Sequence, residues 1–144
     1  MVLGSAQSAI LDMYGDGLVR VKLDGDALHA VIKQTGNISA NGGAVQLATN
    51  ARSAAINVDG VVQANSLVER NGVIRLEGGQ NAKVSVNGNL SATGNLAGSK
   101  GGTIEVTGEQ VALFKNASLD ASGDVGGGTV LVGGDLQGKN VQVY

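Results

Sequence analysis

One pattern recurs along the chain: a glycine followed by apolar residues at every second position. It occurs five times, and its starts are separated by 26, 29, 30 and 26 residues. Alternation with a period of two, in segments rich in β-branched residues, is typical of short strands. A strand that returns at a nearly constant interval indicates a repeat architecture. The five segments are 17–21, 43–47, 72–76, 102–106 and 128–132.

Two further strands follow in each unit. Residues 56–64 match residues 84–92 position by position, and looser versions occupy 32–40 and 111–121. Gly, Asn and Asp lie between the strands, where backbone turns need them. An antiparallel sandwich also has short strands separated by turns, but it does not explain why the same strand recurs. A coil that winds once per repeat does explain it, because equivalent strands then form parallel sheets.

The sequence therefore predicts an all-β protein, a right-handed parallel β-helix of about five coils of 26–30 residues. We expect a single domain over 1–144, with 1–16 as a lead-in or cap and coils that start near 17, 43, 72, 102 and 128.

The repeat alignment predicts which side chains face inward. In the first sheet these are Val19, Val45, Ile74, Ile104 and Val130, then Val21, Leu47, Leu76, Val106 and Val132. In the second they are Ile56, Val84 and Val111, then Val58, Val86 and Leu113. In the third they are Ile38, Val62, Leu90 and Leu119, then Ala40, Ala64, Ala92 and Ala121. Two polar columns should face water: Arg20, Gln46, Arg75, Glu105 and Leu131, and Ser39, Gln63, Ser91 and Asp120.

Composition is compatible with this narrow core. The 144 residues include 24 glycines but no Pro, Cys or Trp, so Val, Leu, Ile and Ala must fill the interior. A hydrophobic fraction of 42% with 15% charged residues argues against disorder. The formal net charge of −2 predicts no nucleic-acid partner. No apolar run approaches the roughly 20 residues of a membrane span, and 1–17 does not resemble a signal peptide.

Residues that could carry chemistry are few. His29 is the single histidine and lies in no acylation motif, so we interpret it as a surface or corner residue. Asp120 and Asp124 could be spaced like a glycosidase pair, but no aromatic residue is near them to hold a sugar. We expect Asp120 to bond the turn at Ser122 and Gly123 instead. Turn roles are likewise expected for the acids of 24–26 and for Asp135, because the tandem calcium nonapeptide is missing. No catalytic, cofactor or metal site is therefore assigned, and no enzyme activity is expected.

Three segments form a group of related motifs: Gly-Gly-Thr-Ile-Glu-Val-Thr-Gly (101–108), Ala-Ser-Leu-Asp-Ala-Ser-Gly (117–123) and the glycine-rich run 126–139. They resemble filamentous-haemagglutinin-like exoproteins, the large adhesins of Gram-negative two-partner secretion systems. Residues 13–21 are similar to the same family. The family's amino-terminal secretion domain carries an Asn-Pro-Asn-Gly type motif, whereas this sequence contains no proline. We therefore interpret the chain as an internal stem segment.

The resemblance implies secretion to the cell surface through an outer-membrane transporter, in virulence and cell adhesion. The expected function is a structural stem that projects a distal binding or toxin module. One alternative is a module that binds a host glycan or protein receptor through its corner loops; a β-helical polysaccharide-acting enzyme is a weaker one. An unpaired strand edge at the end of the stack also predicts end-to-end self-association, with Val141 to Tyr144 at that end.

Overall fold

The computed structural model describes residues 2–3, 8–14, 18–24, 30–49, 54–78 and 82–133, with side chains for 31–49, 55–78 and 82–133. These residues form an all-β solenoid in which parallel strands follow one another around three sheets. About three turns, β6–β8, β9–β11 and β12–β14, have nearly all their side chains described.

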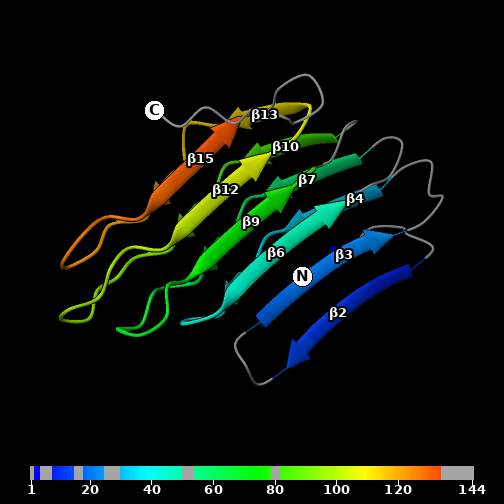
Figure 1. Cartoon of the computed structure of the whole chain (residues 1–144). Coiled ribbons are helices and arrows are strands. Elements are labelled where there is room, and N and C mark those ends of the chain that lie inside the picture. The colour runs from blue at the N-terminus through cyan, green and yellow to red at the C-terminus, as the bar shows by residue number, and fades with distance from the viewer. Residues whose placement is uncertain are drawn as a thin grey trace.

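The first sheet is the broad one at the front of Figure 1. Its strands, in spatial order, are β15 (Thr129–Gly133), β12 (Thr103–Thr107), β9 (Val73–Glu77), β6 (Ala44–Thr49), β3 (Leu18–Asp24) and β2 (Ser8–Tyr14). The second sheet contains β1 (Val2–Leu3), β4 (Ala30–Gln34), β7 (Ala54–Val58), β10 (Ala82–Val86) and β13 (Gln110–Leu113). The third contains β14 (Ser118–Asp120), β11 (Asn89–Ser91), β8 (Val61–Gln63) and β5 (Asn37–Ser39).

The strand register confirms the columns predicted from the repeat. In the first sheet, Val45 pairs with Ile74, Ile74 with Ile104 and Ile104 with Val130. The second sheet pairs Val84 with both Ile56 and Val111, and the third pairs Leu90 with both Val62 and Leu119. The backbone of β3 also pairs as predicted, with Val19 opposite Val45.

Side chains of these columns form one continuous core. Leu47, Ile56, Leu76, Leu90 and Ile104 are each at most 1% exposed. The predicted alanine column is buried too, from 0% exposure at Ala64 to 9% at Ala121. Full burial of a Leu or Ile side chain contributes about 1.5–3 kcal/mol each, so the columns are the principal source of stability.

The last turn departs from the prediction of full burial. Val130 and Val132 are each 39% exposed and Leu113 is 48% exposed, although all three keep the predicted register. Their equivalents one turn earlier, Ile104, Val106 and Val86, are at 0%. The physical reason is that an inward side chain needs a covering turn on both sides, and within the described residues these three have one on one side only.

Two antiparallel strands lie at the opposite end of the stack, which the repeat did not predict. β2 pairs with β3 along its whole length, from Ser8 opposite Asp24 to Tyr14 opposite Leu18. β1 pairs antiparallel with β4. Among the described strands, two of the three sheets therefore end, on this side, in a strand that runs against the others; Figure 1 shows this for β2 beside β3.

Gln34 occupies an inward position that Val58 and Val86 occupy in later turns. It is only 2% exposed, and a buried amide needs hydrogen bonds. Its Nε2 donates to the carbonyls of Gly36 and Val61, and its Oε1 accepts from the Gly60 N–H at 3.1 Å. This side chain thus joins the corner of one turn to the corner of the next.

Candidate functional site: the corner after the third sheet

The corner after the third strand of each turn is the most variable part of the solenoid. Only residues 40–43 follow β5, whereas 64–72, 92–102 and 121–128 connect the later third-sheet strands to the first sheet. Figure 1 shows these three longer connections as successive loops along one edge of the molecule. Because loops of a solenoid can change while its core stays constant, this corner is where binding is expected.

In the second and third of these loops, a backbone hydrogen bond joins the last residue to the first. The Gly102 N–H donates to the Ala92 carbonyl at 2.7 Å, and the Gly128 N–H donates to the Ala121 carbonyl at the same distance. At Gly72 a Cβ would lie 1.4 Å from the Ala64 oxygen, and at Gly102 and Gly128 it would lie 2.1 and 1.8 Å from the carbonyl oxygen of the equivalent glycine one turn earlier. Only glycine allows the backbone to pass at these distances, which explains the glycine that starts these three repeats.

Asn65 holds two neighbouring loops together. Its Oδ1 accepts from the Ser91 hydroxyl at 2.8 Å, and from the Thr93 N–H and hydroxyl at 3.1 Å each. Its own N–H donates to Oδ1 of Asn41, one turn earlier, at 3.1 Å. The amide side chains therefore continue the ladder of the third sheet beyond the alanine column.

Asp124 makes the equivalent link on the next pair of loops. Its Oδ2 accepts from the Gly98 N–H at 2.9 Å, while its own N–H donates to the Gly94 carbonyl at 3.0 Å. The Val125 N–H donates to the Ser99 carbonyl at 3.1 Å. The loops are thus ordered by hydrogen bonds from turn to turn.

Asp120 bonds the turn that follows it, as predicted for Ser122. Its Oδ1 accepts from the Ser122 N–H at 2.9 Å. The bond to Gly123 that was also expected is not found among the described residues. The hydrogen bonds from the Ser122 backbone and side chain lower the pKa of Asp120 from its ordinary value of 3.8. A glycosidase general acid needs the opposite shift, so Asp120 is suited to accepting hydrogen bonds rather than to donating a proton.

Other residues considered from the sequence lie elsewhere. Asp26, His29 and Asp135 fall outside the described residues, as does the side chain of Asp24. Within the part of the chain that the structure describes, no group of three or more His, Cys, Asp or Glu side chains could hold a metal ion. The same part contains no helix long and apolar enough to cross a membrane.

The outward face of the first sheet carries the predicted ion pair. Arg75 Nε lies 2.8 Å from Glu105 Oε2, with side chains 48% and 27% exposed. Next to it, Gln46 Nε2 donates to Glu77 Oε2 at 2.6 Å. An exposed pair of this kind contributes at most about 1 kcal/mol.

Apolar side chains on the corner loops were not anticipated from the sequence. Val68, Leu96 and Val125 are 58%, 51% and 58% exposed. Each is the fourth residue after an alanine of the buried column, a regularity that the repeat alignment could have revealed.

No family model, curated protein or solved structure matches this chain.

Proposed function

We propose that this chain is a stem segment of a large secreted adhesin of a two-partner secretion system. A secretion domain outside this sequence would direct it through an outer-membrane transporter to the cell surface. There the stem would project a distal binding or toxin module. The observation that supports a stem is the in-register addition of turns along one axis, with inward columns at 0% exposure through successive turns. Such a coil adds a fixed length per repeat, which suits a spacer.

We also propose that the coil winds to the right and contains five turns, starting near residues 17, 43, 72, 102 and 128. Parallel strands of one sheet that are joined by a crossover are right-handed in nearly all proteins. The connection from β6 to β9 through the other two sheets is such a crossover. An experimental structure that shows a left-handed coil or a different number of turns would contradict this part of the proposal.

Deleting one complete turn tests the stem. Removal of 73–102 joins Gly72 to Thr103, which pairs in the same register as Val73. β12 then replaces β9 beside β6. We expect the shortened stem to fold and the exoprotein that contains it to be exported. The distal binding or toxin module should keep its activity. Its length should fall by about one strand spacing, 4.8 Å.

The matched control removes half a turn, residues 73–87. This deletion places β11 after the corner loop and misaligns every later column, so export or folding should fail. The stem proposal is wrong if whole-turn deletion abolishes the distal activity while the protein is still folded and displayed.

A receptor-binding role through the corner loops is the second candidate. The exposed Val68, Leu96 and Val125 favour it. Replacing 65–71 by the short connection 41–42 should abolish adhesion if the loops bind a receptor, with folding and export unchanged. Adhesion that survives this exchange supports the stem and contradicts the loop-binding role.

A further inference from the structure

Three Asn–Gly pairs lie at corners of the solenoid, at residues 41–42, 71–72 and 87–88. Asparagine is a thermolabile residue. A following glycine promotes loss of the side-chain amide, because it has no Cβ to hinder attack by its backbone nitrogen. The reaction needs a mobile asparagine and a glycine nitrogen that can approach it, so the contacts of each pair determine its rate.

The pair 41–42 is held at both of the groups that would react. Asn41 Oδ1 accepts from the Asn65 N–H at 3.1 Å. The Gly42 N–H donates to the Asn65 carbonyl at 2.7 Å. The side chain and the attacking nitrogen are therefore both fixed to one residue of the next turn.

The pair 87–88 is held through its backbone. The N–H groups of Asn87 and Gly88 both donate to the Val58 carbonyl, at 2.8 and 3.1 Å. Asn87 is half-buried, and a Cβ at Gly88 would lie 2.0 Å from the Gly60 oxygen. This glycine nitrogen therefore cannot move toward its asparagine without opening the stack.

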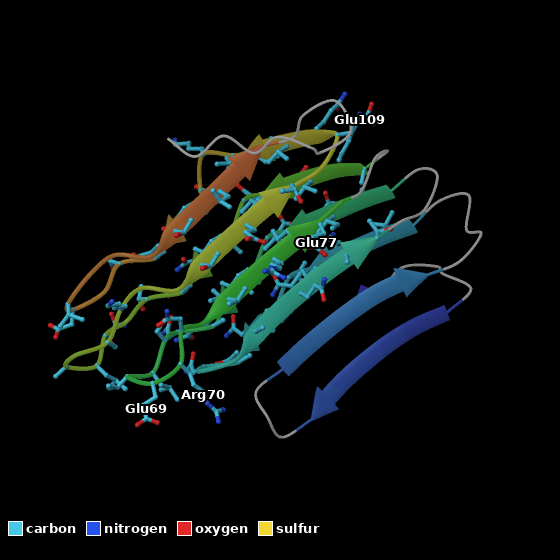
Figure 2. The ribbon with its side chains drawn as sticks, in the orientation of Figure 1. Glu69, Arg70, Glu77 and Glu109 are labelled. Atoms are coloured by element: carbon cyan, nitrogen blue, oxygen red, sulfur yellow. The ribbon has the colours of Figure 1, made fainter. Side chains whose placement is uncertain are left out.

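Asn71 is held least of the three. It is exposed, and within the described part of the chain neither its backbone nor its side chain makes a hydrogen bond. It follows a tight hairpin in which Leu67 and Arg70 exchange backbone hydrogen bonds of 2.7 and 3.2 Å. Figure 2 shows the side chains of Glu69 and Arg70 pointing away from the body of the molecule at this loop. Asn71 therefore lies at the base of a projecting loop, where its side chain is free to turn.

One buried hydroxyl holds the nitrogen that would attack Asn71. The Gly72 N–H donates to Ser66 Oγ at 3.0 Å, and Ser66 is only 2% exposed. Ser66 is anchored to the next loop, because its own N–H donates to the Thr93 carbonyl at 2.9 Å. The Ser66 hydroxyl thus keeps the Gly72 nitrogen away from Asn71.

We propose that Asn71 is a site of spontaneous modification and that the Ser66 hydroxyl sets its rate. When the Gly72 nitrogen leaves this hydroxyl, it loses its proton to solvent and bonds to Cγ of Asn71. The Cγ–Nδ2 bond breaks, and the amide nitrogen takes up a proton and departs as ammonia. Water then opens the resulting succinimide ring at one of its two carbonyls. The product is aspartate, or isoaspartate when the main chain comes to run through the side-chain carbons.

The isoaspartate product conflicts with the fold. It adds one methylene to the main chain directly before Gly72, whose Cβ position lies 1.4 Å from the Ala64 oxygen. Strand β9 begins at the next residue, so the added atom disturbs the pairing of Val73 in the first sheet. The modification therefore destabilises the coil, whatever module the coil carries.

Peptide mass spectrometry of the whole chain, incubated at mildly alkaline pH, tests the ranking. Asn71 should convert faster than Asn41 and Asn87 while the protein is folded. In concentrated urea the three should convert at similar rates, because each is followed by glycine and the contacts of the fold are lost. Enzymatic methylation of isoaspartate identifies the longer product.

Ser66→Ala tests control by the hydroxyl. Loss of this acceptor should raise the rate at Asn71 about two- to tenfold, the change in open population expected when one hydrogen bond is lost. The rates at Asn41 and Asn87 in the same molecules should not change, which separates local release from general loosening. Ser99→Ala is the matched control, because Ser99 is a buried serine of the next loop whose hydroxyl bonds within its own loop. It should leave the rate at Asn71 unchanged.

Asn71→Gln tests the consequence, since glutamine would have to form a six-membered ring and cyclises much more slowly. After incubation the native chain should lose thermal stability in proportion to its isoaspartate content, whereas Asn71→Gln should not. Equal losses in the two proteins would contradict a role for Asn71.

Three further results would overturn the proposal. One is conversion at Asn71 in the folded chain that is no faster than at Asn41 or Asn87, a comparison that does not depend on whether Ser66→Ala folds. Another is an unchanged rate at Asn71 in folded Ser66→Ala. The third is an equal rise at all three sites in that variant.

Discussion

Replacing Leu90 tests the register on which the whole fold depends. Leu90 is at 0% exposure, between Val62 of the preceding turn and Leu119 of the following one. Truncation to alanine removes buried methyl groups and leaves a cavity, which costs about 2–5 kcal/mol. Leu90→Asp adds the burial of an unpaired carboxyl, worth several kcal/mol more. Since domains are stable by only about 5–15 kcal/mol, we expect Leu90→Asp not to fold.

Asn89 is the matched control on the same strand. It is exposed, and its neighbours in register are Val61 and Ser118, so a carboxylate there meets no like charge. Asn89→Asp should change stability by no more than about 0.5 kcal/mol. Ser91 is less suitable, because its hydroxyl donates to Asn65 Oδ1 and a carboxylate there would lie opposite Asp120.

Urea denaturation followed by circular dichroism is the appropriate assay, since the chain contains no tryptophan. For Leu90→Ala the assay measures the loss in free energy of unfolding. For Leu90→Asp it shows whether the protein folds at all. Leu119→Ala should cost less than Leu90→Ala, because Leu119 is only partly buried. Equal losses for Leu90→Ala and Asn89→Ala would refute the assignment of the inward face.

Four other substitutions address the corners. Gly72→Ala should destabilise the protein by at least about 2–3 kcal/mol, because the new Cβ collides with the Ala64 carbonyl oxygen. Gly126→Ala should be tolerated, because nothing lies within 4 Å of the position of its Cβ. Thermal melts of the two variants test this difference. Gln34→Leu should cost about 1–3 kcal/mol, because the Gly36 and Val61 carbonyls lose a donor and the Gly60 N–H loses its acceptor. An unchanged urea midpoint would contradict this. Asp120 has a lowered folded-state pKa, so its contribution is present above the unfolded pKa and is lost as pH falls through the folded one. Asp120→Ala should therefore match the wild type at acid pH and be slightly less stable at neutral pH, an effect that solvent screening keeps small.

The strands and their register could be predicted because both depend on short-range regularities. A period of two places Val45, Ile74 and Ile104 on one face, and the repeat length places them in one column. The Arg75–Glu105 pair followed from the same alignment. No long-range information was needed, since in a solenoid each turn contacts its neighbours in a fixed order.

Candidate-site residues were harder to find. The alignment ended at the alanine column, so it did not show that Asn65 and Asp124 bond successive loops. Such bonds depend on loop conformations that differ in length from turn to turn. Val68, Leu96 and Val125 were left unassigned because the alignment stopped at the alanine column, four residues before each of them, and their spacing alone does not tell buried from exposed.

The sequence by itself determined the all-β class, the three strands per turn and the identity of the inward columns, because alternation and repetition are local properties of the chain. The tertiary structure alone decided the antiparallel pairing of β1 and β2, since the direction of a strand depends on which edge it meets. It also decided that Gln34 is buried with its hydrogen bonds satisfied, while Leu113, Val130 and Val132 stay partly exposed. Burial is a property of position in the stack: the same apolar column is covered where a turn lies on each side and open where one side lacks it.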